Sequence, residues 1–96
     1  MFNENPSVEV LEETHALKIL LVLLREGRMI KGVLNQKITR STVSVQRRID
    51  ALVRAGLLSE EQEEQHPFRK YIELTPRGRA VAEHLQAIEE ILQKEA

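Results

Sequence analysis

The chain has 96 residues, a net charge of −1 and no cysteine, which suits one small domain and excludes disulfides, thiolate metal sites and cysteine nucleophiles. The start of the chain lacks the basic segment and apolar core of a secretory signal. The longest nearly apolar run, residues 16–24, is too short to cross a bilayer. We therefore expect a soluble cytoplasmic protein with no membrane partner.

Charge is unevenly distributed along the chain. Residues 25–54 hold eight lysines and arginines against two acids, whereas residues 1–13 and residues 57–66 each hold four glutamates and no lysine or arginine. A phosphate group responds to the local potential rather than to the net charge of the whole molecule. The basic middle of the chain is therefore compatible with nucleic-acid binding despite the nearly neutral total.

Residues 7–26 predict a long helix that begins after the turn-forming Asn5-Pro6-Ser7 and ends at Gly27. Apolar residues cover most of its circumference, which is typical of a helix buried on nearly all sides. In so small a domain, we expect one side of this helix to contact a partner subunit. Its predicted core stripe comprises Leu17, Leu20, Leu21 and Leu24.

Two further helices are predicted in the basic segment. Residues 28–38 form a short one, because apolar residues recur there at four-residue spacing, and residues 42–55 form a longer one. Ser41 or Thr39 can serve as N-cap of the longer helix, and we prefer Ser41; Gly56 is placed to end it in a left-handed conformation. The stripe that faces the core in this longer helix comprises Val45, Ile49 and Leu52.

The last third of the chain predicts a β-hairpin followed by a helix. Residues 57–61 and 70–74 are strand-like and are separated by a polar segment that contains Pro67. Thr75 as N-cap and Pro76 at the first helical position form a strong helix start. The apolar face of this last helix either closes its own core or packs with the first helix against a second subunit, and we favour a homodimer. The predicted dimer interface comprises Ile19, Val22, Leu23, Leu85, Ile88 and Leu92.

The sequences RAGLL at residues 54–58 and LTPRG at residues 74–78, with a strand-like hairpin between them, are specific in combination. On these motifs the chain resembles, over residues 14–92, the winged helix-turn-helix transcription regulators of the broad MarR, ArsR and PadR-like group. The resemblance implies a mainly α fold with a small β-hairpin, in the order α-α-α-β-β-α. It implies one domain, 1–96, in which 14–74 form the helix-turn-helix and wing and 75–96 form a dimerisation helix.

The resemblance further implies a homodimer that lays two recognition helices, about residues 42–55, into successive major grooves of double-stranded DNA. Hydroxyl groups and Gln46 can bond base edges or phosphates, Val43 can contact a thymine methyl, and Arg47 can address guanine or phosphate. Arg48 suits phosphate, as does Arg40, which stands where the family usually has an aliphatic residue. The predicted DNA-binding set on and before this helix comprises Arg40, Ser41, Thr42, Val43, Ser44, Gln46, Arg47 and Arg48.

The wing carries a charge pattern that is unfavourable for DNA on one strand and favourable on the other. Its first strand is acidic and would be repelled by phosphate, whereas Arg69 and Lys70 on the return side would be attracted. We therefore expect the wing to contact DNA through Arg69 and Lys70 only, or weakly.

Two other interpretations compete with sequence-specific recognition, and a third possibility would add ligand control to it. The arginines of residues 42–55 could form an ordinary solvated face. The domain could instead be a protein-interaction module or a nonspecific chromatin or transcription-assembly module, since an acidic wing suits a basic partner. Finally, an apolar small-molecule effector could bind between the first and last helices, where the sequence offers no convergent polar groups.

Neither catalysis nor metal binding is expected. His15, His66 and His84 lack the spacing of a metal-binding pair on one helix, and the chain has no nucleophile-base arrangement or phosphate-binding glycine loop. We expect no cofactor, and a location in the prokaryotic cytoplasm, in association with the nucleoid.

Overall fold

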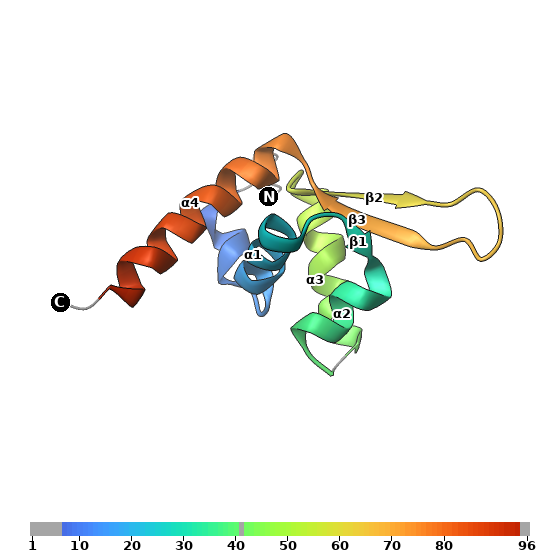
Figure 1. Ribbon diagram of the computed structural model, residues 1–96, viewed down its shortest axis with the longest axis horizontal. Helices are drawn as coiled ribbons and strands as arrows, with labels where there is room; N and C mark the ends of the chain where they lie inside the picture. The colour runs from blue at the N-terminus through green and yellow to red at the C-terminus, as the bar shows by residue number, and fades with distance from the viewer. Residues whose placement is uncertain (1–6, 41, 95–96) are drawn as a thin grey trace, which may run out of the picture.

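The computed structural model describes residues 7–40 and 42–94, which form helices around a small antiparallel sheet (Figure 1). Both the order α-α-α-β-β-α and the hairpin are confirmed, with two short elements added. The elements are η1 (Val8–Glu12), α1 (Ala16–Glu26), β1 (Met29–Ile30), α2 (Lys31–Ile38), α3 (Thr42–Arg54), β2 (Leu58–Gln62), β3 (Lys70–Leu74) and α4 (Pro76–Gln93).

The predicted long N-terminal helix is interrupted. Ser7 caps the 3-10 helix η1, since its hydroxyl accepts the Glu9 amide hydrogen, and the chain turns at His15, which has a left-handed φ of 71°. The interruption lets Val10 and Leu11 of η1 pack back against the core.

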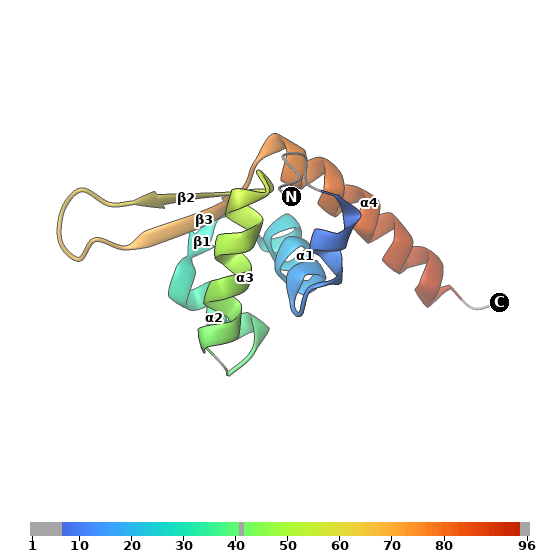
Figure 2. The ribbon, with the colours of Figure 1, turned by 180° about the vertical axis from the view of Figure 1, so that it is seen from behind.

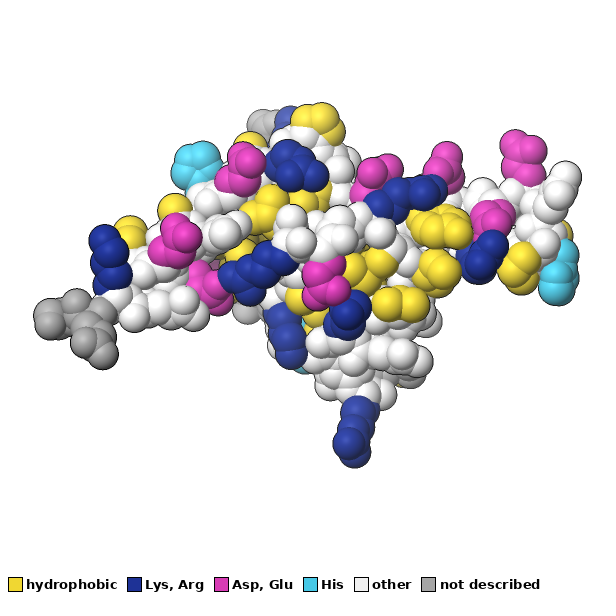
Figure 3. Space-filling view, in the orientation of Figure 1, with side chains coloured by type: hydrophobic (Ala, Val, Ile, Leu, Met, Phe, Trp, Pro, Cys, Tyr) yellow, Lys and Arg dark blue, Asp and Glu magenta, His cyan; other side chains and the backbone are white. Residues whose placement is uncertain are grey.

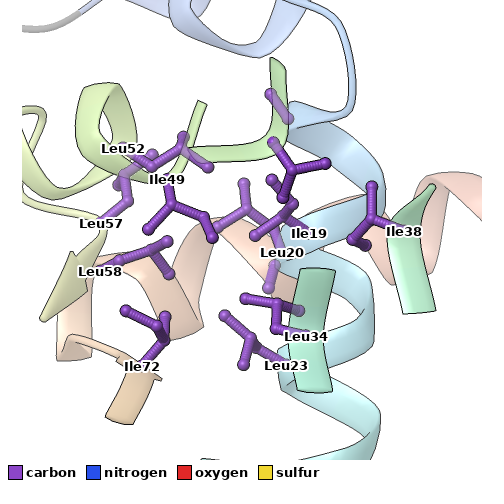
Figure 4. Close-up of a cluster of buried hydrophobic side chains, with 13 residues drawn as sticks. Ile19, Leu20, Leu23, Leu34, Ile38, Ile49, Leu52, Leu57, Leu58 and Ile72 are labelled. Atoms are coloured by element: carbon purple, nitrogen blue, oxygen red, sulfur yellow. The ribbon is translucent and has the colours of Figure 1, made fainter. Parts of the chain in front are cut away.

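The face of α1 that meets the core differs from the predicted stripe. The buried residues are Ala16, Ile19, Leu20 and Leu23, whereas Leu17 is 44% exposed. Ile19 and Leu23, which we expected at a dimer interface, are 0% and 1% exposed within a single chain and belong to its own core (Figure 4). Neither side chain is accessible to a partner, so that part of the predicted interface is wrong; Val22 is half-buried.

Between α1 and α2 lies the strand β1, which the sequence did not predict. It pairs with β3 in the register Met29↔Ile72 and Ile30↔Tyr71, and the sheet order is β1-β3-β2. Strands β2 and β3 and the loop between them form a hairpin, which we call the wing. Strand β1 anchors the base of the wing to the helical body, and the far end of the wing projects away from the body (Figure 1).

The motifs around Gly56 and Gly78 meet at one joint. Gly56 has a φ of 81°, and its carbonyl accepts the Thr75 hydroxyl at 2.6 Å. The carbonyl of Leu57 accepts the Thr75 backbone amide hydrogen at 3.1 Å, and Thr75 caps α4 by accepting the Gly78 amide hydrogen at 3.0 Å. A Cβ at Gly78 would overlap the Leu57 backbone. The two motifs therefore contact each other directly at this joint.

The apolar contacts of α4 with the core come from its N-terminal part, and Glu89 further along pairs with Arg25 of α1. Ala82 is buried, and Val81 and Leu85 pack against the core, whereas Ile88 and Leu92 are 51% and 78% exposed. The C-terminal half of α4 extends from the body on the side opposite the wing (Figure 1).

Candidate nucleic-acid interface

Helix α3 is held against the domain by the predicted stripe. Val45, Ile49 and Leu52 are each fully buried, and Ile49 and Leu52 converge on Ile19 and Leu20 of α1 (Figure 4). Seen from behind, α3 lies in front of α2 and the sheet, so the face opposite its buried stripe is open to solvent (Figure 2). The exposed residues of this face are Val43, Gln46, Arg47, Asp50 and Arg54.

Most of the basic residues in the central segment have acidic partners. Five of the eight between residues 25 and 54 form ion pairs, some with residues far away along the chain. The pairs are Arg25 with Glu89, Arg28 with Glu61 at 2.7 Å, Lys31 with Glu60 at 3.1 Å and Asp50 at 3.7 Å, Lys37 with Glu26 at 2.9 Å, and Arg48 with Glu13 at 3.7 Å.

Three cations of this segment have no acidic partner within residues 7–40 and 42–94. They are Arg40, just before α3, and Arg47 and Arg54, on the exposed face of α3. The positive charge left unbalanced in the basic segment is thus concentrated on and beside this helix. A solvent-exposed helix edged by unpaired guanidinium groups can accept a phosphate or a base edge without first breaking an ion pair.

Arg48 differs from its neighbour Arg47. Its Nε donates a hydrogen bond to the Thr14 carbonyl at 2.9 Å, and its side chain is only 18% exposed. The residue therefore ties α3 to the turn before α1. The structure does not group it with the open cations, although we predicted it as a phosphate contact.

The start of α3 is described only in part. Ser41 and the side chain of Thr42 lie outside the described residues, so the expected N-cap and their predicted DNA contacts stay predictions. Ser44 is half-buried and makes an interaction of its own. Val43, 61% exposed, and Gln46 are open.

At the tip of the wing, Arg69 is bound to Glu63 by several hydrogen bonds. Its Nε donates to Oε1 at 2.6 Å, its Nη2 to Oε2 at 3.3 Å and its backbone amide to Oε1 at 3.0 Å. The side-chain hydrogen bond from Arg69 lowers the pKa of the Glu63 carboxyl, and the carboxylate raises the pKa of Arg69. Both groups are charged at neutral pH, and the pair carries no net charge.

The glutamates on the first strand of the wing, Glu60 and Glu61, also have basic partners. Glu60 lies 3.9 Å from the Lys70 ammonium group and also pairs with Lys31. Arg28 stacks over the Tyr71 ring, 4.1 Å from its centroid, while it binds Glu61. Figure 3 shows basic and acidic side chains interleaved along this arm. The predicted wing cations, Arg69 and Lys70, are exposed but carry their own counter-ions.

A cavity of about 430 Å³ lies between η1 and the start of α4. It lies between the start of the predicted first helix, residues 7–26, and the last helix, and its walls are mostly apolar; the Arg77 side chain adds a charged group that we did not expect there. The lining residues are Ser7, Val8, Val10, Leu11, Leu57, Arg77 and Val81.

The described part of the chain contains no cluster of three histidine, aspartate or glutamate side chains able to hold a metal ion. None of the described helices is long and apolar enough to cross a membrane.

Comparison by sequence finds no matching protein-family model and no matching curated protein. Solved structures do match. A protein from Porphyromonas gingivalis W83 described as a MarR-family transcriptional regulator superimposes with a TM-score of 0.79 and 20% identity, covering 93% of this chain and 87% of that one. The transcriptional regulator ytfH from Salmonella typhimurium gives a TM-score of 0.73 and 27% identity, with 92% and 81% covered.

The PcaV transcriptional regulator from Streptomyces coelicolor, solved with its natural ligand, is also similar, with a TM-score of 0.72 and 21% identity. The match covers 83% of this chain and 57% of PcaV. Together with the helix order, the β-hairpin and the joint at Gly78, these similarities establish that the chain has the winged helix-turn-helix fold.

Proposed function

We propose that this protein is a sequence-specific, double-stranded DNA-binding transcription regulator that inserts α3 into the major groove. The observation that supports this most strongly lies on and just before α3, where Arg40, Arg47 and Arg54 have no acidic partner among the described residues while the other cations of the basic segment are paired. An α-helix fits the major groove of B-DNA, and its N-terminal residues reach base edges.

The side chains on this face suggest a division of roles. Gln46 and Arg47 can form bidentate hydrogen bonds to adenine and guanine, and Val43 can contact a thymine methyl group. Arg40 and Arg54, at the two ends of the helix, suit phosphates on either side of the groove. Ser41 and Thr42 complete the predicted set as hydroxyl donors at the helix start.

The protein acts as a homodimer in this proposal. The half of α4 beyond the body exposes Ile88, Ile91 and Leu92, an apolar surface that a second copy would bury. Two protomers place two α3 helices on one face of the duplex, which predicts an inverted-repeat site.

The dimer is tested by replacing both Ile88 and Leu92 with glutamate and measuring the mass in solution by light scattering. The variant should be monomeric at a concentration where the parent protein is dimeric. Val33→Glu, which changes an apolar residue on α2 that is 42% exposed, should leave the dimer intact. A parent protein that is monomeric at all concentrations would refute the dimer.

DNA recognition is tested by selecting bound duplexes from a random pool and measuring the affinity for the most enriched duplex at increasing salt concentration. We expect an enriched inverted repeat. If each protomer uses two or three unpaired arginines on phosphate, log K should fall against log salt with a slope of about −4 to −5. Enrichment should be lost in Gln46→Ala and Arg47→Ala but kept in Arg79→Ala, an exposed arginine of α4 that serves as control.

Two other outcomes of this selection point to the competing functions. Steep salt dependence without an enriched sequence would indicate a nonspecific chromatin-type protein. Failure to bind any duplex at low salt would indicate a protein-interaction module, and the acidic side of the wing would then be the first surface to examine.

Control by a small molecule is a further part of the proposal. The cavity between η1 and α4 has largely apolar walls, and the similar PcaV structure holds a ligand. A thermal-shift screen, repeated with Val81→Trp to fill the cavity, checks this: a true effector should stabilise the parent protein and not the variant. In the cell, the proposal assigns the protein to nucleoid DNA in the cytoplasm.

A further inference from the structure

The wing carries two basic residues that could reach DNA, yet both lie beside glutamates of the same hairpin. Arg69 is held by Glu63, and Lys70 lies near Glu60. In a winged-helix protein bound through α3, this hairpin is the element that would extend over the flanking backbone.

The contact between Glu63 and Arg69 has the geometry with which a guanidinium group binds phosphate. Both carboxylate oxygens accept from the guanidinium, from Nε at 2.6 Å and from Nη2 at 3.3 Å. These fork-shaped bonds are the ones that arginine offers to a phosphate oxygen pair. A DNA phosphate must therefore displace Glu63 or accept only the remaining donors of a neutral pair.

The hairpin also keeps Glu63 in position independently of the guanidinium. The Arg69 backbone amide donates to Glu63 Oε1 at 3.0 Å, and the Glu63 amide donates to the Arg69 carbonyl at 2.9 Å. The neighbouring Glu64 is exposed and has no ion-pair or hydrogen-bond partner within the described residues. Two adjacent glutamates thus carry the same charge, but only one of them holds an arginine.

We infer that Glu63 is a positioning residue that limits DNA affinity by occupying Arg69 as an internal counter-ion in place of phosphate. This inference rests on the proposed function and states what limits the contribution of the wing to DNA affinity. Counter-ion release explains the effect: when a phosphate replaces Glu63, the freed carboxylate takes up a cation, and little net release remains to drive binding. Most of the affinity then comes from α3. The contribution of the wing depends on how easily a phosphate displaces the Glu63 carboxylate from Arg69.

The test compares Glu63→Gln with Glu64→Gln on the full chain and a selected duplex. The amide oxygen in Glu63→Gln can still accept the Arg69 backbone hydrogen, so the hairpin is expected to persist. Glu63→Gln should bind about two- to fivefold more tightly. The slope of log K against log salt should become steeper by about 1 for each protomer. Glu64→Gln removes the same charge one residue away and should change affinity less, with an unchanged slope.

A double-mutant cycle separates release of Arg69 from simple loss of negative charge. In an Arg69→Ala background, Glu63→Gln should no longer increase affinity beyond the effect of Glu64→Gln. Equal effects of the two glutamine substitutions in the parent background, or a gain from Glu63→Gln that persists without Arg69, would overturn the inference. Failure of the parent protein to bind any duplex at low salt would instead overturn the proposed function.

The pair itself can be checked without DNA. The carboxyl pKa of Glu63, followed by NMR, should lie below the ordinary value of a glutamate and should rise in Arg69→Ala. A Glu63 pKa that is the same in the parent protein and in Arg69→Ala would show that the pair does not form in solution, and the inference would fail.

Discussion

Helix α3 and the wing both carry exposed arginines, but their surroundings differ. Arg47 and Arg54 project from a helix whose opposite face is fully buried, and neither has an acidic partner in the described structure. Arg69 projects from a hairpin tip outside the core and is bound to Glu63. The outer face of α3 is supported by the core, and its arginines are free of acidic partners among the described residues. The wing tip lies outside the core, and the charge of Arg69 is neutralised by Glu63.

This difference shows that a charge count along the chain does not give the charge that a partner meets. The basic segment has an excess of six positive charges in sequence, but glutamates between Glu13 and Glu89 neutralise much of it. An exposed ion pair contributes little to stability. Within residues 25–54, the ion pairs of the described structure leave unpaired positive charge only at Arg40 and on α3.

The largest effect is expected from removing the support of α3. Ile49→Ala deletes buried atoms under α3 and should lower the free energy of unfolding by about 3 kcal/mol. Phe68→Ala at the tip of the wing, where the ring is 47% exposed, should change it by less than about 0.5 kcal/mol. Urea denaturation measures both. Similar losses would mean that the wing is as integral to the core as α3.

The joint between α3, the wing and α4 should be the next most sensitive position. Gly78→Ala forces a Cβ against the Leu57 backbone and should cost about 2 kcal/mol of unfolding free energy. Gly32→Ala, within α2 and with open space around the position of its Cβ, should stabilise by about 0.5 to 1 kcal/mol. The account of this joint is wrong if both substitutions act in the same direction in thermal melts.

A smaller effect is expected when the wing cations are removed. Arg69→Ala combined with Lys70→Ala should weaken DNA binding by less than about threefold at moderate salt, because both cations already have counter-ions. Arg47→Ala alone should weaken it by about tenfold or more. Fluorescence anisotropy with one duplex compares them. A wing variant that loses more affinity than the α3 variant would reverse the ranking of the two surfaces.

The smallest effect concerns pH. Because Arg69 lowers the pKa of Glu63 in the folded state, the pair stabilises the hairpin above the ordinary pKa of a glutamate. That stabilisation is lost as the pH falls through the lowered pKa. The stability difference between the parent protein and Glu63→Gln in urea titrations should therefore be present at pH 7 and decrease as the pH falls below the ordinary pKa of a glutamate. A difference independent of pH would exclude charge as its origin.

Local patterns in the sequence predicted the elements that depend on local chemistry. The stripe of α3, the positive φ of Gly56 and the cap by Thr75 are confirmed. Each depends on residues close together in sequence. The strand β1 was missed because two residues show no alternation and its partner, β3, lies about forty positions further along.

The orientation of α1 and the charge pairing could not be predicted in the same way. Helix α1 is apolar on nearly all sides, so periodicity could not select the face that carries Ile19 and Leu23. Ion pairs such as Arg28 with Glu61 and Arg48 with Glu13 join residues more than thirty positions apart. Only the tertiary fold separates the paired cations from the open ones on α3. Of the ten predicted DNA-binding residues, the structure leaves Arg40, Val43, Gln46 and Arg47 open on this surface.

In our proposal, α3 rather than the wing forms the main contact with DNA. An NMR titration of the labelled protein with a selected duplex tests it most directly, because each backbone amide reports separately. The account predicts the largest shift changes between Val43 and Arg54, with smaller changes between Glu63 and Lys70. The largest changes in the wing or along α4, with α3 unaffected, would contradict it.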